Sequence, residues 1–129
     1  MLARLSRIVL MVRGPEGVAR SVNFFHGAVG LPVLRVTDDW AELDASGGAN
    51  SAASSGITLT LQAVDTEPQL STGYSPILTF QVTNMDETVA ACAQAGGHLD
   101  GPIQYPAHGK VAALRTPDGH MIGLYEPTV

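Results

Sequence analysis

Cysteine, charge and long hydrophobic runs are all scarce in this chain of 129 residues. With Cys92 as its single cysteine, the chain can form no internal disulfide and no cluster of thiolate ligands. The hydrophobic run from Ile8 to Val12 is shorter than a secretory signal core or a membrane-spanning helix, so we interpret it as a strand. The formal net charge is −5 and no basic run is present, which argues against nucleic acid and against a membrane surface as partners. We expect a cytoplasmic protein.

Hydrophobic residues are plentiful, at 45% of the chain against 15% for charged residues. This balance is typical of a globular protein and leaves room for buried surface such as a subunit interface. The length fits about one domain with one core. We therefore expect residues 1–129 to form a single domain in which both halves share one sheet.

The same order of elements is predicted twice along the chain. In the first half, the glycines and proline of residues 14–17 break a strand, and Gly30 and Pro32 end the helix that follows. In the second half, Asn84 or Asp86 lies near the helix cap, and Gly96-Gly97 ends the helix. Module 1 spans about 5–63, with strands predicted at 5–13, 32–37, 40–44 and 57–62 and a helix at 18–28. Module 2 spans about 76–127, with strands predicted at 76–82, 99–105, 110–115 and 120–126 and a helix at 85–95. A polar linker at 64–75 joins the modules, and we expect the small-residue loop at 47–56 to be mobile.

Alternation along the predicted strands separates two faces, because successive side chains of a strand point to opposite sides. One set is apolar and is expected to pack under the helices, with Cys92 as a small core residue beside it. This apolar set comprises Ile8, Leu10, Val12, Ile57, Leu59, Leu61, Leu78, Phe80, Val82, Ile122 and Leu124. The other set is mixed in character, which suits a concave small-molecule site but also a plain solvent-exposed face. The mixed set comprises Arg7, Val9, Met11, Thr58, Thr60, Gln62, Ile77, Thr79, Gln81, Met121, Gly123 and Tyr125.

Four short motifs accompany this duplicated pattern. They are Phe24-Phe25, Val29-Gly30-Leu31, Ala95-Gly96-Gly97 after the second helix, and Thr116-Pro117-Asp118-Gly119-His120 before the last strand. Together they resemble the vicinal oxygen chelate superfamily, which contains glyoxalase I, extradiol dioxygenases, fosfomycin-resistance enzymes and bleomycin-binding proteins. The resemblance runs from about Leu5 to Pro127. It implies an α+β fold in which two βαβββ modules form a cupped mixed sheet, and it implies a homodimer.

Metal-dependent members of this superfamily hold a divalent metal on side chains from the first and last strands of each module. The positions that match these ligands are Arg7, Thr60, Ile77 and Gly123. Ile77 and Gly123 offer no side-chain donor, and the guanidinium of Arg7 is permanently cationic and would repel a dication. We therefore predict that the chain uses no metal and no other cofactor. The histidines, which we expect to be surface or turn residues, are His26, His98, His108 and His120.

Without a metal, the predicted cleft is suited to binding a small organic molecule. Arg7 can hold an anionic or carbonyl-bearing ligand through charge-assisted hydrogen bonds, and the alternative is an ion pair with Glu126, Asp44 or another acid. Trp40 either stacks on a ligand near the rim or simply packs against its strand neighbours. The candidate cleft residues are Arg7, Met11, Thr60, Gln62, Ile77, Thr79, Gln81, Met121, Gly123 and Tyr125.

Three functions stay open at this point. The first is metal-free binding of a small molecule, as the resemblance to bleomycin-binding proteins implies. The second is a metal-dependent lyase or dioxygenase of the glyoxalase type, which requires that the ligand positions are misassigned. The third is an enzyme without a metal, such as an isomerase or hydrolase, with His108, Tyr105 or Glu42 as acid or base. For this third function the sequence offers no nucleophile and base at a recognisable spacing.

Overall fold

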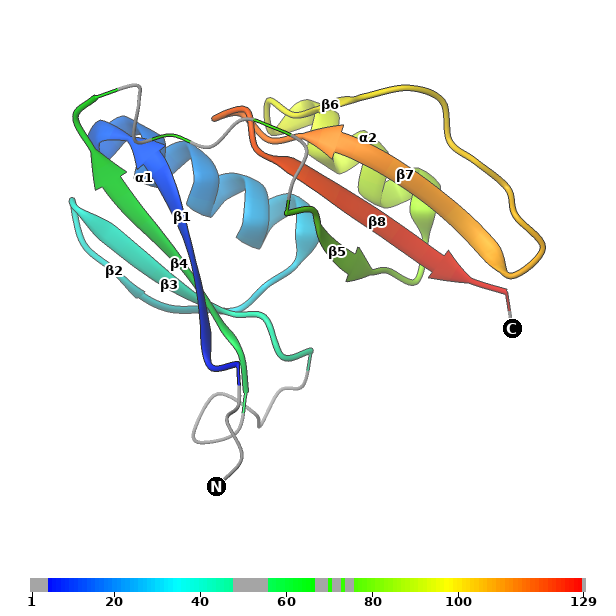
Figure 1. The fold of residues 1–129 in the computed structure, drawn as a ribbon, viewed down its shortest axis with the longest axis horizontal. Coiled ribbons are helices and arrows are strands. Elements are labelled where there is room, and N and C mark those ends of the chain that lie inside the picture. The colour runs from blue at the N-terminus through cyan, green and yellow to red at the C-terminus, as the bar shows by residue number, and fades with distance from the viewer. Residues whose placement is uncertain (1–4, 48–55, 67–69, 71–72, 74–75, 129) are drawn as a thin grey trace.

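Two four-stranded sheets, each with its own helical segment, make up the fold (Figure 1). The computed structural model describes residues 5–47, 56–66, 70, 73 and 76–128, so most of the loop that we expected to be mobile lies outside the described residues. Module 1 consists of β1 (Arg7–Arg13), α1 (Gly14–Val22), the π-helix η1 (Asn23–Val29), β2 (Val33–Val36), β3 (Trp40–Asp44) and β4 (Thr58–Val64). Module 2 consists of β5 (Leu78–Gln81), α2 (Met85–Gln94), β6 (His98–Leu99), β7 (Gly109–Arg115) and β8 (Met121–Pro127). The predicted α+β class and the duplicated modules are confirmed.

Strand order is the same in both modules, β1-β4-β3-β2 in the first and β5-β8-β7-β6 in the second. The first strand of each module runs parallel to the last, and the remaining pairs are antiparallel. The expectation that the two halves share one sheet was wrong for the described residues. Because β1 and β5 are edge strands of separate sheets, side-chain packing joins the modules where we expected a hydrogen-bonded ladder.

The first helical segment begins earlier than predicted. The glycines and proline of residues 14–17 do not separate strand from helix, since α1 starts at Gly14 directly after β1. Pro15 lies in the first turn, where a backbone N–H has no partner within the helix, and Gly14 adopts a positive φ of 67° that suits glycine. Breaker residues at this position therefore start the helix. The segment ends as expected, with Gly30 in the left-handed conformation.

The strand predicted at 99–105 was also wrong. Pairing with β7 covers His98 and Leu99 and ends with the N–H of Asp100, which donates to the carbonyl of Ala113 at 2.8 Å; a single further bridge joins Gln104 to Val111. Gly101 has a φ of 97° and Pro102 follows it, so the chain leaves the sheet between these two contacts. This detour matters for the site, because the segment runs alongside β7 and lines a hollow there.

One cluster of buried side chains contains residues of both modules. Phe25 contacts Phe24 edge to face, with ring centroids 5.2 Å apart, and lies 5.9 Å from the ring of Phe80 in module 2. Cys92 is fully buried in this core, as predicted, and burial raises the pKa of its thiol to about 11. Of the predicted apolar set, all except Ile57 belong to this core or pack against it. No helix in the described part of the chain is long and apolar enough to cross a membrane.

Candidate functional site

A charged cluster lies on the face of the module 1 sheet that points away from α1. Strand pairing places Arg35 opposite Glu42 and Glu42 opposite Thr60, in a row across β2, β3 and β4. Arg7 reaches this row from β1, where its Nη1 donates to Oε2 of Glu42 at 2.8 Å and to Oγ1 of Thr60 at 3.0 Å. Nε of Arg35 lies 3.4 Å from Oε1 of Glu42. One carboxylate thus stands between two guanidinium groups, and we call Arg7, Arg35, Glu42 and Thr60 the arginine cluster.

The ion pair that we considered as the alternative for Arg7 is therefore present, with Glu42 as its acid. Asp44 accepts the backbone N–H of Ser46 at 2.9 Å, and Glu126 accepts the backbone N–H of Met85 at 2.6 Å. The side chain of Arg7 is 50% exposed and that of Glu42 is 12% exposed. Pairs with an exposed partner contribute little to stability. The arginine cluster is consequently available for contacts with a ligand without being essential to the fold.

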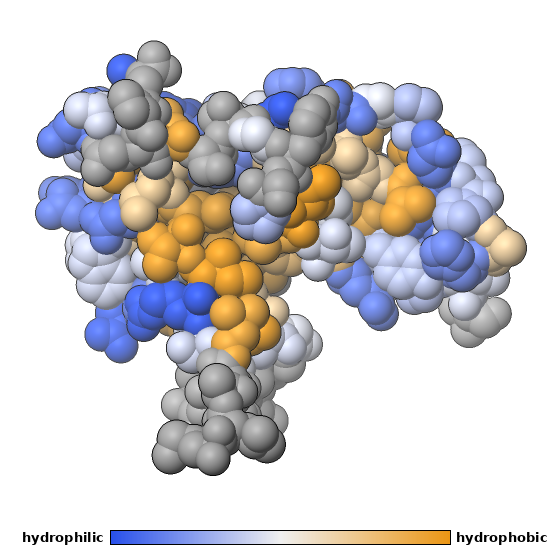
Figure 2. All heavy atoms as spheres, viewed as in Figure 1, coloured by the Kyte–Doolittle hydropathy of each residue, from blue (hydrophilic) through white to orange (hydrophobic). Residues whose placement is uncertain are grey.

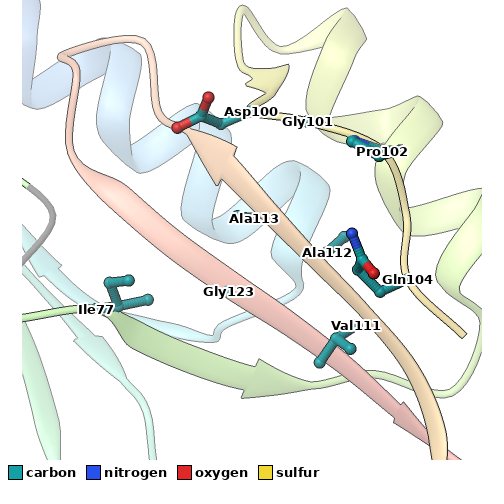
Figure 3. A pocket seen from close by; sticks show the side chains of 9 residues that line it. All are labelled: Ile77, Asp100, Gly101, Pro102, Gln104, Val111, Ala112, Ala113 and Gly123. Atoms are coloured by element: carbon teal, nitrogen blue, oxygen red, sulfur yellow. The ribbon is translucent and has the colours of Figure 1, made fainter. Parts of the chain in front are cut away.

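The second feature is a hollow of about 300 Å³ on the face of the module 2 sheet (Figure 3). Its floor is apolar and comes from β7, β8 and Ile77, which directly precedes β5, while the chain between β6 and β7 forms its wall. The lining residues are Ile77, Asp100, Gly101, Pro102, Gln104, Val111, Ala112, Ala113 and Gly123. Ile77 and Gly123 were predicted from the sequence and lie here together. A Cβ at Gly123 would stand 2.9 Å from Oγ1 of Thr79, so glycine leaves room for this neighbour.

The other predicted cleft residues are distributed more widely. Met121 is buried and lines a smaller hollow of about 120 Å³ between the modules, together with Val9 of β1. The hydroxyl of Tyr125 donates to the carbonyl of His108 at 3.1 Å. Nε2 of Gln62 is directed to backbone carbonyls at 3.4 Å, while Met11 is half-buried and Gln81 is exposed. The structure thus brings Arg7 together with Thr60, and Ile77 together with Gly123 and Thr79.

Sequence reasoning missed Arg35 and most of the hollow's lining. We confined the concave face to the first and last strands of each module, although Val111 and Ala113 alternate with buried residues in the predicted strand 110–115. That alternation was a usable signal. Arg35 gave no comparable signal, because every residue of β2 is exposed. The wall at residues 100–104 was missed because we assigned it to a strand, although it contains the strand breakers Gly101 and Pro102.

The four positions that match the superfamily's metal ligands do not fit a divalent metal. Arg7 brings a fixed positive charge, and Ile77 and Gly123 bring no donor atom. Across the described residues, no group of three or more His, Cys, Asp and Glu side chains is placed to hold a metal ion. Glu42, the nearest acid to Arg7, is already bound by two guanidinium groups.

His120 differs from the surface or turn residue that we expected, since it is buried where the modules meet. Its backbone N–H donates to Oγ1 of Thr116 at 3.1 Å, and its Nε2 has no hydrogen-bond partner among the residues that the structure describes. Burial lowers the pKa of His120 below its ordinary value, and the charge of Asp118 and the backbone carbonyl of Met11 oppose this shift. His120 is therefore neutral in the folded protein at neutral pH.

Because His120 is neutral when folded, we expect the free energy of unfolding to fall in mild acid. The unfolded chain binds a proton at His120 below about pH 6.5, whereas the folded chain binds it only at lower pH. The neutral His120 contributes fully to the free energy of unfolding above pH 6.5. This contribution is lost as the pH falls from 6.5 through the pKa of His120 in the folded protein. Urea unfolding at pH 7.5 and pH 5.5 measures this loss, and His120→Gln should show a smaller one. An equal loss in both proteins would contradict the assignment.

The comparisons with known proteins agree with this architecture. The sequence model of a family described as the Glyoxalase/Bleomycin resistance protein/Dioxygenase superfamily matches residues 4–124. A glyoxalase-related enzyme from Fulvimarina pelagi has a similar structure, with a TM-score of 0.72 at 18% identity, over 97% of this chain and 88% of that one. TnmS3, an antibiotic-binding protein from Streptomyces sp. CB03234, has a TM-score of 0.63 at 23% identity over 98% of each chain. A bleomycin-binding protein from Streptomyces verticillus, complexed with copper(II)-bleomycin, has a TM-score of 0.62 at 18% identity, over 99% of this chain and 100% of that one. No curated protein matches the sequence.

Proposed function

Because the chain belongs to the glyoxalase/bleomycin resistance protein/dioxygenase superfamily, we propose that it binds a small organic molecule on its cupped sheets without a metal ion. The observation that carries the proposal is the arginine cluster, in which Glu42 and Thr60 hold the guanidinium of Arg7 at a position where metal-dependent relatives place a ligand. The hollow beside Ile77 and Gly123 supplies apolar surface for an organic molecule. Two structural neighbours, TnmS3 and the bleomycin-binding protein, bind antibiotics, which supports the same class of function.

No described contact favours the enzymatic alternatives. Glu42 is held by two arginines, and Tyr105 is 68% exposed. The ring of His108 contacts only that of Tyr125, with centroids 5.8 Å apart, among the described aromatic contacts. None of these three groups is paired with a nucleophile in the described part of the chain, so we propose no reaction.

The proposal predicts that ligand binding is independent of metal. Purified protein is dialysed against Zn²⁺, Ni²⁺, Mn²⁺ or Fe²⁺ and then against metal-free buffer, and its metal content is measured by elemental analysis. We expect well under one ion per chain, and we expect unchanged affinity for 2-naphthamide, a planar neutral probe, with and without a chelator. One tightly held dication per chain, or loss of probe binding with the chelator, would overturn the metal-free proposal.

We also propose that the protein is a homodimer. Val9 on β1 and Ile77 next to β5 are 44% and 46% exposed, and hydrophobic surface gathers around the centre of the face shown in Figure 2. Exposed apolar surface of this kind is typical of an interface. Sedimentation velocity tests this expectation directly.

A further inference from the structure

The arginine cluster has more hydrogen-bond donors than its own acceptors use. Each guanidinium carries five N–H donors. Arg7 uses only Nη1, and Arg35 is paired only through Nε, among the described contacts. Within the cluster two positive charges face one negative charge, which leaves the cluster itself with a charge of +1. The carboxylate of Asp44, two residues from Glu42 on β3, is buried and accepts hydrogen bonds from Ser46. Nε and Nη2 of Arg7 and both Nη groups of Arg35 are left to bind an anion.

An aromatic and apolar surface lies directly beside these donors. Trp40 is two residues from Glu42 on β3, so both side chains point to the same face at a spacing of about 7 Å. The pairing register continues this row through Gln62 to Met11 on β1. Trp40 and Met11 are both half-buried. A flat molecule that contacts Trp40 can therefore place an acidic group against the two arginines.

We propose that the arginine cluster binds the carboxylate of a planar organic acid and that Glu42 weakens this binding by competing for the same guanidinium groups. The inference rests on the proposed function and names the chemical class of its ligand. A planar carboxylate matches the fork of a guanidinium group in two parallel hydrogen bonds. A net charge of +1 is neutralised by one carboxylate, whereas a dianion such as phosphate would leave one negative charge uncompensated at the cluster. Glu42 also holds Arg7 and Arg35 in position, so it sets both the geometry and the affinity of the site.

The test compares 2-naphthoate with 2-naphthamide, which has the same ring system and no charge, by isothermal titration calorimetry. We expect the unaltered protein to bind 2-naphthoate about tenfold more tightly than 2-naphthamide. Arg35→Gln should remove about tenfold of the affinity for 2-naphthoate, whereas Glu42→Gln should increase it severalfold. Neither variant should change the affinity for 2-naphthamide, because the amide carries no charge.

Lys110→Gln is the matched control, since it removes one positive charge on β7, away from the arginine cluster. It should leave both affinities unchanged at 0.15 M salt, where distant charges are screened. If Arg35→Gln behaves like Lys110→Gln, or if Glu42→Gln weakens binding of 2-naphthoate, the carboxylate site is wrong. In that case 2-naphthamide still binds and the proposed function stands. If neither probe binds, the proposed function fails together with the inference.

Discussion

Replacing Gly97 by alanine is expected to lower the free energy of unfolding by about 3 kcal/mol, because the added methyl group has no space. A Cβ at this position would lie 2.6 Å from Cε1 of Phe24, 2.9 Å from the carbonyl oxygen of Arg115 and 3.2 Å from that of Cys92. Two of these neighbours are backbone atoms, and Phe24 is fully buried. These close contacts can therefore be relieved only if α2 shifts against β7 or against the first module. Urea denaturation followed by circular dichroism measures the change.

Two other glycines provide graded controls. Gly96 has a φ of 97°, and its Cβ would make an ordinary contact with Pro117, so Gly96→Ala should cost about 1 kcal/mol through backbone strain alone. A Cβ added at Gly73 would meet no described heavy atom within 4 Å, and Gly73→Ala should be close to neutral. The expected order of destabilisation is Gly97, then Gly96, then Gly73. A Gly97→Ala variant as stable as Gly96→Ala would show that the core adjusts around the methyl group.

The same region illustrates what local sequence patterns can predict. Gly96-Gly97 predicted the end of the second helix, and the structure has the two hydrogen bonds of a Schellman motif there, from Gly96 to Ala93 and from Gly97 to Cys92. The cap was predictable in the same way, since the side chain of Asn84 accepts the N–H of Glu87 at 3.0 Å. Both features depend on residues only a few positions apart. The contact between Gly97 and Phe24 joins residues 73 positions apart in different modules, and no local pattern predicts it.

The candidate site likewise has a part that local sequence patterns predict and a part that they do not. Strand alternation placed Arg7 and Thr60 on one face. In the structure Nη1 of Arg7 lies 3.0 Å from Oγ1 of Thr60. The partner of Arg7 depends on the register between β3 and β4, which brings Glu42 opposite Thr60. The sequence left three or more acids possible for this role. Pairing between distant strands therefore decided which acid meets Arg7, and it also brought in Arg35.

The wall of the module 2 hollow was unpredictable for a different reason. Residues 99–105 contain alternating apolar residues, and that pattern indicates a strand. Gly101 and Pro102 interrupt it, so the chain leaves the sheet and encloses the space above Val111. A propensity argument that gave these two breakers more weight than the alternation would have predicted a loop, though not its course alongside β7.

Removing the carboxylate of Asp118 is expected to cost about 3 kcal/mol of unfolding free energy, because this carboxylate is itself buried and connects the two modules through two hydrogen bonds. Oδ1 of Asp118 accepts Nη2 of Arg20 at 2.7 Å, and Oδ2 accepts the hydroxyl of Ser21 at 2.7 Å. Both donors lie on α1, whereas Asp118 lies in the turn before β8. Ser21 is fully buried and the side chain of Asp118 is 3% exposed. Asp118→Ala therefore leaves a buried hydroxyl without its partner.

The contributions of the hydrogen bonds from Arg20 and from Ser21 can be separated with two further variants. Arg20→Gln should cost less than about 1 kcal/mol, because the side chain of Arg20 is 46% exposed and water can replace its partner. Ser21→Ala removes the donor together with its need for an acceptor, so the double variant with Asp118→Ala should be less destabilised than the sum of the two single changes. Urea denaturation of the four proteins gives this coupling energy. If Asp118→Ala costs no more than Arg20→Gln, or if the coupling is zero, the buried bond to Ser21 does not hold the turn before β8 against α1.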